Sequence, residues 1–243
     1  MKLNFYILYM FLILGIGKRE NNTNAEITYN LAMSNKEITK SDTPKILKDV
    51  TFTLKCKPWE SLFTFDKQKI DKYNANMRYV IKSGGKTTRY KNIKTKEKYY
   101  VMEGLLDKPA LVNKNNKQDW IITKETKLIS GYKVYKAYLT SKSRFNTKPS
   151  IKIIAWFTSE IPLPFGPVGY DGLPGLILQL EKNDFIFTAS NIKLINSNSD
   201  INLEAPKGIK MTEKEAKNIF RKKTGVDFDK KMKQRALKKK KNE

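Results

Sequence analysis

Histidine is absent from the 243-residue sequence. The chain therefore lacks the side chain that most often acts as a general base near neutral pH, and also the commonest metal ligand. Ser-His-Asp and Cys-His catalysis are excluded, as are zinc sites built on histidine. The sequence predicts no catalytic, metal-ligating or cofactor-binding residue and no cofactor, and we expect no enzyme activity.

Cysteine occurs once, as Cys56, which excludes an internal disulfide and a zinc site built on several cysteines. Cys56 ends the run 49–56, in which apolar residues occupy every second position. A free cysteine is among the most buried residue types, and a reactive thiolate needs a partner base that histidine would normally supply. We therefore expect Cys56 to be a core residue.

Arginine is scarce, with six residues among the 48 basic ones, although the net charge is +24. One interpretation of this charge is a polyanionic partner such as nucleic acid, anionic lipid or acidic glycan. The other is a lysine-rich surface without a dedicated site. Nucleic-acid recognition relies strongly on the planar arginine fork, so the scarcity of arginine favours the second interpretation.

The N-terminus carries an apolar run, Phe5–Ile16, preceded by Lys2. The run is too short to span a bilayer, which needs about twenty apolar residues, but it fits the hydrophobic region of a secretory signal. Gly15 and Gly17 offer the small residues of a cleavage site. Residues 1–17 are therefore predicted to be a signal peptide or an N-terminal anchor, and the protein is predicted to be exported to the periplasm or cell envelope.

Residues 18–210 show period-two alternation, which is typical of half-buried strands. The predicted strands are 26–33, 49–56, 77–82, 86–91, 98–102, 120–123, 127–131, 132–139, 150–158, 176–181 and 185–190, the last extending towards 195. Ser83-Gly84-Gly85 and Lys182-Asn183-Asp184 are predicted hairpin turns. Short strands joined by polar turns predict a mainly β fold, a curved antiparallel sheet or half-barrel.

Residues 211–243 differ in character from the rest. Thr212-Glu-Lys-Glu215 has the spacing of a capping box, which predicts a helix that continues to Gly225. A basic tail follows, and a run such as Lys230–Lys241 is usually solvated. The alternative is weak polyanion contact through this tail.

Residues 159–178 concentrate proline and glycine, which together specify one contorted backbone path. Leu173-Pro174-Gly175 suits a type II turn, with proline and glycine at its two central positions. The run Leu176-Ile-Leu178 then enters a strand.

The hexapeptide Gly172-Leu-Pro-Gly-Leu-Ile177 resembles, letter for letter, the signature of the GLPGLI family of the Bacteroidota. The block Ala155–Pro162, followed by Gly166-Pro167, is similar to the family's flanking sequence. The resemblance covers about residues 50 to 190 and implies a secreted protein of unestablished role. By fold analogy it implies a curved sheet like that of periplasmic lipoprotein carriers. Val134 stands where the family often has cysteine, so the disulfide of relatives is not possible here.

The candidate site is the family-motif loop and its flanks. Its residues are Trp156, Glu160, Pro162, Gly166, Pro167, Gly172, Leu173, Pro174, Gly175, Leu176 and Ile177. One interpretation is a structural corner, against which Trp156 and Phe157 pack. The other is the rim of a ligand groove, because rigid irregular loops often carry binding sites.

Three functions compete. The first is a non-catalytic binding or carrier-like module for an apolar ligand, a peptide or an envelope protein. The second is polyanion binding, and the third is a carboxylate-dependent hydrolase using Glu160, Asp171 and Glu181. We expect Glu160 and Asp171 to cap turns or stay solvated. A sheet covered fully by the C-terminal helix would favour a closed structural domain, and an open apolar face would favour binding.

Overall fold

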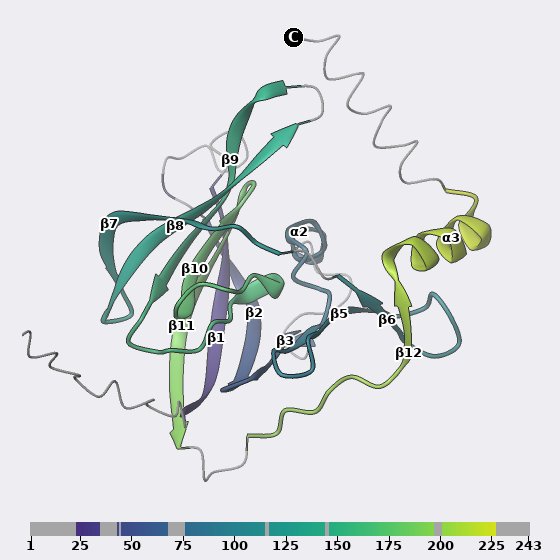
Figure 1. Ribbon diagram of the computed structural model, residues 1–243, viewed down its shortest axis with the longest axis horizontal. Coiled ribbons are helices and arrows are strands. Elements are labelled where there is room, and N and C mark those ends of the chain that lie inside the picture. Colours follow the sequence, from purple (N-terminus) through teal and green to yellow (C-terminus); the bar gives the residue numbers. More distant parts are fainter. Residues whose placement is uncertain are drawn as a thin grey trace, which may run out of the picture.

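The chain folds around one large, strongly twisted β-sheet (Figure 1). The computed structural model describes residues 23–34, 43, 45–67, 76–114, 117–143, 146–196 and 201–226. In chain order its elements are β1 (Thr23–Met33), β2 (Lys45–Lys57), β3 (Glu60–Phe65), α2 (Met77–Ser83), β4 (Arg89–Asn92), β5 (Glu97–Met102), β6 (Ala110–Asn113), β7 (Ile121–Ile129), β8 (Tyr132–Ser143), β9 (Asn146–Thr158), the 3₁₀ turn η2 (Pro167–Gly169), β10 (Leu176–Lys182), β11 (Phe185–Asn196), β12 (Ile209–Thr212) and α3 (Glu213–Thr224).

The twelve strands form one open sheet in the order β12-β6-β5-β4-β3-β2-β1-β11-β10-β9-β8-β7. Neighbouring strands are antiparallel except β6 and β12, which pair in parallel. The predicted mainly β class is confirmed, although the β12 pairing makes the sheet mixed. β12 also crosses the predicted domain boundary at residue 210. Residues 1–17 and Lys230–Lys241 lie outside the described residues, and no helix in the described ranges is long and apolar enough to cross a membrane.

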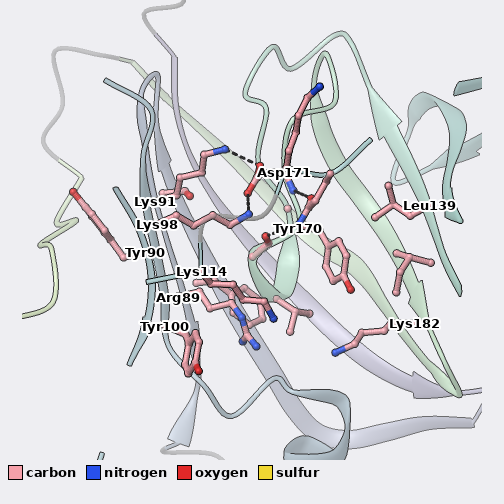
Figure 2. A pocket seen from close by; sticks show the side chains of 18 of the residues that line it. Arg89, Tyr90, Lys91, Lys98, Tyr100, Lys114, Leu139, Tyr170, Asp171 and Lys182 are labelled. Atoms are coloured by element: carbon pink, nitrogen blue, oxygen red, sulfur yellow. Dashed lines mark hydrogen bonds and ion pairs between the residues drawn. The ribbon is translucent and has the colours of Figure 1, made fainter. Parts of the chain in front are cut away.

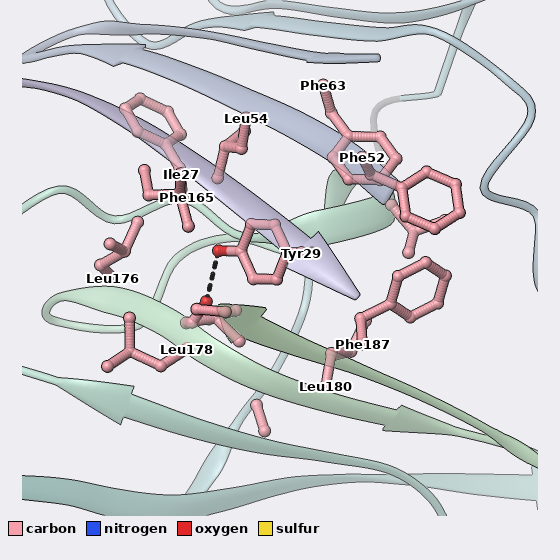
Figure 3. Packing of buried hydrophobic residues seen from close by; sticks show 14 of the residues in the cluster. Ile27, Tyr29, Phe52, Leu54, Phe63, Phe165, Leu176, Leu178, Leu180 and Phe187 are labelled. Atoms are coloured by element: carbon pink, nitrogen blue, oxygen red, sulfur yellow. Dashed lines mark hydrogen bonds between the residues drawn. The ribbon is translucent and has the colours of Figure 1, made fainter. Parts of the chain in front are cut away.

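The core lies against the central strands, where the predicted alternation holds. On β1, Ile27, Tyr29 and Leu31 are fully buried, and Phe52 and Leu54 on β2 face the same cluster (Figure 3). Each such side chain contributes roughly 1.5–3 kcal/mol on burial. Cys56 is buried in this cluster as predicted, and burial raises the pKa of its thiol far above the usual value.

The predicted strand at residues 77–82 is wrong, because this segment forms α2. Val80 and Ile81 favour a strand locally, but Val80 packs into the core cluster and has no strand partner. Gly84 adopts φ +80° and caps the helix through its N–H to the Ile81 and Val80 carbonyls. Ser83-Gly84-Gly85 therefore ends a helix rather than forming a hairpin turn.

Other strand predictions hold with shifted ends. The segments 120–123 and 127–131 merge into β7, and the strand predicted at 86–91 begins only at Arg89. Three strands were not predicted: β3, β6 and β12. The last two have four residues each and pair at one end of the sheet, so neither is long enough to show a clear alternation.

The loop between β9 and β10 is tightly packed, but its turn differs from the prediction. The Gly175 N–H donates to the Leu173 carbonyl (2.8 Å), and the Leu176 N–H donates to the Ile161 carbonyl (2.9 Å). A type II turn would instead pair Leu176 with Leu173. A Cβ at Gly175 would lie 1.9 Å from the Thr158 carbonyl oxygen, so only glycine fits this close approach of two backbones.

The predicted capping box and helix are confirmed in α3. The Thr212 hydroxyl accepts from the Glu215 N–H (3.2 Å), and the Glu215 carboxylate accepts from the Thr212 N–H (2.7 Å). Gly225 ends the helix in the left-handed conformation. α3 packs through Ala216 against β6 and lies at one end of the molecule (Figure 1). It does not cover the centre of the sheet, whose buried face packs against the loop between β9 and β10.

Candidate functional site

The loop between β9 and β10, residues 159–175, is called the motif loop below. A cavity of about 620 Å³ opens between this loop, the β4–β5 pair and the strands β8–β10. Its lining is rich in basic side chains and includes two carboxylates (Figure 2). The basic residues are Arg89, Lys91, Lys98, Lys114, Lys117 and Lys182. The carboxylates are Asp119 and Asp171.

Two short strands place much of this charge through simple alternation. Arg89 and Lys91 lie two residues apart on β4, and Lys98 lies opposite Lys91 on β5. Between them, Tyr90 and Tyr99 stack with ring centres 5.3 Å apart and pack into a separate apolar cluster. Side chains along a strand point alternately to the two faces of the sheet, so the tyrosines anchor one face while the basic groups face the cavity.

Asp171 joins the motif loop to both strands. Lys91 Nζ lies 2.7 Å from its Oδ1, and Lys98 Nζ lies 2.6 Å from its Oδ2. The Lys98 contact is an ion pair that does not meet hydrogen-bond geometry. The side chains of Asp171 and Lys98 are each only 12% exposed. The prediction that Asp171 caps a turn or stays solvated is therefore wrong: the aspartate is buried and doubly ion-paired.

A second set of contacts holds the loop from the other side. Gln118 accepts from the Asp171 N–H (2.9 Å) and donates to the Gly169 carbonyl (3.3 Å). Trp120 Nε1 donates to the Asp171 carbonyl (2.8 Å), and its ring packs edge-on against Tyr170 at 6.1 Å. The loop wall of the cavity is thus preorganised before any ligand enters.

Three other basic groups that line the cavity, Arg89, Lys114 and Lys182, have no acidic counterpart among the described residues. Arg89 Nη1 donates to the Gly84 and Thr87 carbonyls, at 2.8 and 2.9 Å. Lys182 Nζ donates to the Ser83 carbonyl at 3.2 Å. Within the described ranges, no carboxylate forms an ion pair with Arg89, Lys114 or Lys182.

Two of these cations, Arg89 and Lys182, lie near each other beside Gly84. A Cβ at Gly84 would lie 3.3 Å from Lys182 Nζ and 3.6 Å from Arg89 Nη2, so the two charges are no farther apart than these distances together. Burial lowers the pKa of Lys182 to about 8, and repulsion from Arg89 and Lys114 adds to this effect. Burial also lowers the pKa of Arg89 to about 10. Both groups are still mostly protonated at neutral pH.

The loop is shaped around the arginine. Gly169 has φ +74°, and a Cβ there would lie 2.7 Å from Arg89 Cδ. Tyr100 and Tyr170 lie near the guanidinium and oppose the lowering of its pKa. Burial in turn raises the pKa of both tyrosines, so their hydroxyls remain available as hydrogen-bond donors.

The cavity is suited to holding an anion. Its unpaired arginine and lysines can donate charge-assisted hydrogen bonds, and the arginine fork matches a carboxylate or phosphate. Asp171 is neutralised by two lysines, and Asp119 lies 3.1 Å from Lys117. No group of three His, Cys, Asp or Glu residues suited to a metal ion occurs in the part of the chain that the structure describes.

The residues of the predicted motif site divide into four groups. Gly166 alone of them lines the cavity. Those buried beneath it are Pro167, Leu173, Gly175, Leu176 and Ile177, and those exposed are Glu160, Pro162, Gly172 and Pro174. Trp156 is partly buried and donates through Nε1 to Glu181 (3.3 Å), with Lys127 Nζ 4.1 Å from its ring centre.

The three carboxylates considered for hydrolysis are not brought together. Asp171 pairs with its two lysines. Glu160 accepts from the Lys133 N–H (3.2 Å), while Glu181 accepts from Trp156. Each carboxylate thus has a separate partner, and of the three only Asp171 lines the cavity.

The cavity-lining cations were missed by sequence reasoning. A signal was present in the alternating Arg89-Tyr-Lys91 and Lys98-Tyr-Tyr100, each of which places two polar or basic groups on one face of a strand. Arg89 is also one of only six arginines. With 42 lysines in the chain, however, alternation alone does not identify those that converge.

Comparisons with known proteins find a family match for part of the chain. Residues 140–179 match the family model described as "Protein of unknown function (Porph_ging)". No curated protein matches. Two solved structures of PNGF-II, in space groups C2 and P21, share 19% and 18% identity with TM-scores of 0.55 and 0.54. They cover 81% of this chain, which spans only 32–33% of theirs, so the likeness concerns the fold alone.

A third structural match is much weaker. The LolA superfamily protein NE2245 from Nitrosomonas europaea aligns at 9% identity over 71% of this chain and 86% of its own, with a TM-score of 0.28. This score is too low to establish a shared fold.

Proposed function

We propose that the protein is a non-catalytic binding module that holds a small anionic ligand in the cavity beside the motif loop. The observation that carries this proposal is the division among its basic groups. Lys91 and Lys98 share Asp171, whereas Arg89 and Lys182 find only backbone carbonyls. A desolvated charge without a counter-charge is costly, and a bound anion would remove that cost.

The volume of the cavity supports a small-molecule ligand. Binding pockets for such ligands commonly measure about 300–1,000 Å³, and this one measures about 620 Å³. The loop wall is fixed by Gln118, Trp120 and Asp171 through hydrogen bonds and ion pairs. A fixed wall lowers the ordering cost of binding.

Calorimetric titration with inorganic phosphate, sulfate and citrate tests the proposal. Wild type is expected to bind at least one of these anions, more weakly as salt screens the charges. Lys182→Met should weaken binding about tenfold or more, as expected for a lost charge-assisted contact. Lys193→Met removes an exposed lysine outside the cavity and serves as the matched control. Equal affinities for both variants, or no anion binding by wild type, would refute the proposal.

The structure offers less support for the alternatives. An apolar ligand alone would leave the cations at Arg89 and Lys182 desolvated and unpaired. A carboxylate hydrolase needs two converging carboxylates, but Glu160 and Glu181 bind other partners. Polyanion contact through Lys230–Lys241 remains a proposal without a structural observation in its favour.

We further propose that the protein is exported, with residues 1–17 as a signal peptide or anchor. The support is the apolar run Phe5–Ile16 and the small residues Gly15 and Gly17 at its end. Intact-mass measurement on fractionated cells tests this proposal. A shortened chain in the envelope fraction indicates cleavage, and a full-length chain in the membrane fraction indicates an anchor. A full-length chain confined to the cytoplasm would contradict export.

Assignment to the GLPGLI family is also a proposal. The hexapeptide Gly172–Ile177 lies within the matched segment 140–179. A profile built from GLPGLI sequences should align across most of residues 50–190. An alignment confined to the hexapeptide would count against membership.

A further inference from the structure

The walls of the cavity differ in chemistry. The β4–β5 side carries Arg89, Lys91 and Lys98, and Figure 2 shows Leu139 on the opposite side. Leu139 on β8 lies opposite Ile153 on β9, and both line the cavity. One side of the cavity is therefore mainly basic, and the opposite side presents the apolar side chains of Leu139 and Ile153.

The floor continues the apolar wall. Leu54 and Phe63 come from the buried face of β2 and β3, and Val168 comes from the motif loop. All three side chains are apolar and at most 5% exposed. They therefore present a small apolar surface to a ligand. Lys182, at the end of β10, carries its charge to the basic side, where it meets the Ser83 carbonyl.

An inorganic anion would satisfy only one of these walls. It would occupy the basic side near Arg89 and Lys182 and leave the partly exposed Leu139 in contact with water. Removing apolar surface from water is favourable, so a ligand with an apolar portion gains affinity from the second wall. The cavity is also far larger than a single phosphate or carboxylate group needs.

We infer, on the basis of the proposed anion site, that the natural ligand is an anionic amphiphile. Its carboxylate or phosphate head group lies against Arg89, Lys114 and Lys182, and its apolar part lies along Leu139 and Ile153. Fatty acids carry such a carboxylate and alkyl phosphates carry such a phosphate. The experiment below distinguishes these two sources of the negative charge.

Calorimetric titration with a homologous series tests the inference. The probes are inorganic phosphate and butyl, hexyl and octyl phosphate, each below its micelle-forming concentration. Affinity should rise along the series by up to about fourfold per buried methylene. Octanoate has an alkyl chain of similar length and a carboxylate head, so it tests the alternative source of the charge. Tighter binding of either octyl phosphate or octanoate than of its short-chain homologue supports the inference.

The outcomes that overturn it are separable from failure of the anion site. If all alkyl phosphates bind as inorganic phosphate does, and octanoate binds no more tightly than its short-chain homologue, the anion site stands and the amphiphile inference falls. If no anion binds, both fall. Octyltrimethylammonium and octyl glucoside supply cationic and uncharged heads, and binding of either as tight as octyl phosphate would also overturn the inference.

Variants on the apolar wall give an independent readout. Leu139→Ala should weaken the binding of octyl phosphate several-fold more than that of inorganic phosphate, because it removes apolar surface that would contact the alkyl chain. Leu128→Ala changes an exposed leucine on β7 that does not line the cavity and should leave both affinities unchanged. Where Leu139→Ala fails to fold, Ile153→Val provides the same comparison with a smaller deletion. An equal loss for both probes in the folded variant contradicts the placement of the tail.

Discussion

Replacing Lys182 with methionine is expected to stabilise the protein near neutral pH while weakening anion binding. Burial lowers the pKa of Lys182 from 10.5 to about 8. Each pKa unit corresponds to about 1.4 kcal/mol, so keeping this ammonium charged costs the fold about 3 kcal/mol below pH 8. The lost hydrogen bond to the Ser83 carbonyl offsets about 1 kcal/mol. The expected net gain is about 2 kcal/mol in unfolding free energy.

The gain has a defined pH dependence. Lys182 has a lower pKa when folded than when unfolded, so the unfolded chain binds more protons between about pH 8 and 10.5. Wild-type stability relative to the variant therefore rises through this window. The advantage of the variant should be full below pH 8 and disappear by pH 10.5, where the lost hydrogen bond leaves the variant slightly less stable. Urea unfolding of both proteins at several pH values across the window measures this difference.

Two comparisons keep this prediction specific. Lys193→Met, on an exposed position of β11, should show no comparable gain. A saturating anion should reduce the advantage of Lys182→Met, because the anion stabilises only the protein that binds it. A variant that is less stable than wild type at neutral pH, or a gap that stays constant to pH 10.5, would refute the proposed desolvated charge.

Two further predictions concern the loop wall. Asp171→Asn leaves Lys98, whose side chain is 12% exposed, without its counter-charge. We expect a loss of about 3 kcal/mol in urea unfolding, and a loss below about 0.5 kcal/mol would show that the pair is not structural. Gly169→Ala and Gly104→Ala share φ +74°, but only at Gly169 does the new Cβ meet a side chain, at 2.7 Å. Both should lose about 1–2 kcal/mol, while only Gly169→Ala should weaken phosphate binding in calorimetry. Equal affinities of the two variants would contradict a role for the packing of Gly169 against Arg89 in anion binding.

The sequence predicted the fold best where one face of a strand is buried. On β1 and β2, apolar residues at every second position mark the core side, and the structure buries them. The α3 cap was also predictable, because Thr212 and Glu215 interact within one turn. α2 was not, because Val80 and Ile81 carry a local preference for strand that packing overrides.

The site was harder to predict because it depends on pairings between distant segments. The register that places Lys91 opposite Lys98 follows from the β4–β5 pairing. The ion pairs to Asp171 then require the motif loop to fold back over these strands. Hydrophobic alternation does not encode such a fold-back. Asp171 was singled out from the sequence, but its burial depends on two lysines that nothing local distinguishes from the other forty.

The two interpretations of the motif loop apply to different residues of the same loop. Leu163, Phe165 and Leu173 are at most 1% exposed and pack into the core, and Gly175 permits the backbone contact that closes the corner. Residues 168–171 lie between these anchors and face the cavity. Substitutions at the anchors should therefore lower stability and binding together. Substitutions at 168–171 should change ligand affinity even where the protein still folds, in addition to the losses of stability expected for Gly169→Ala and Asp171→Asn. The corner therefore serves to hold one wall of the site in place.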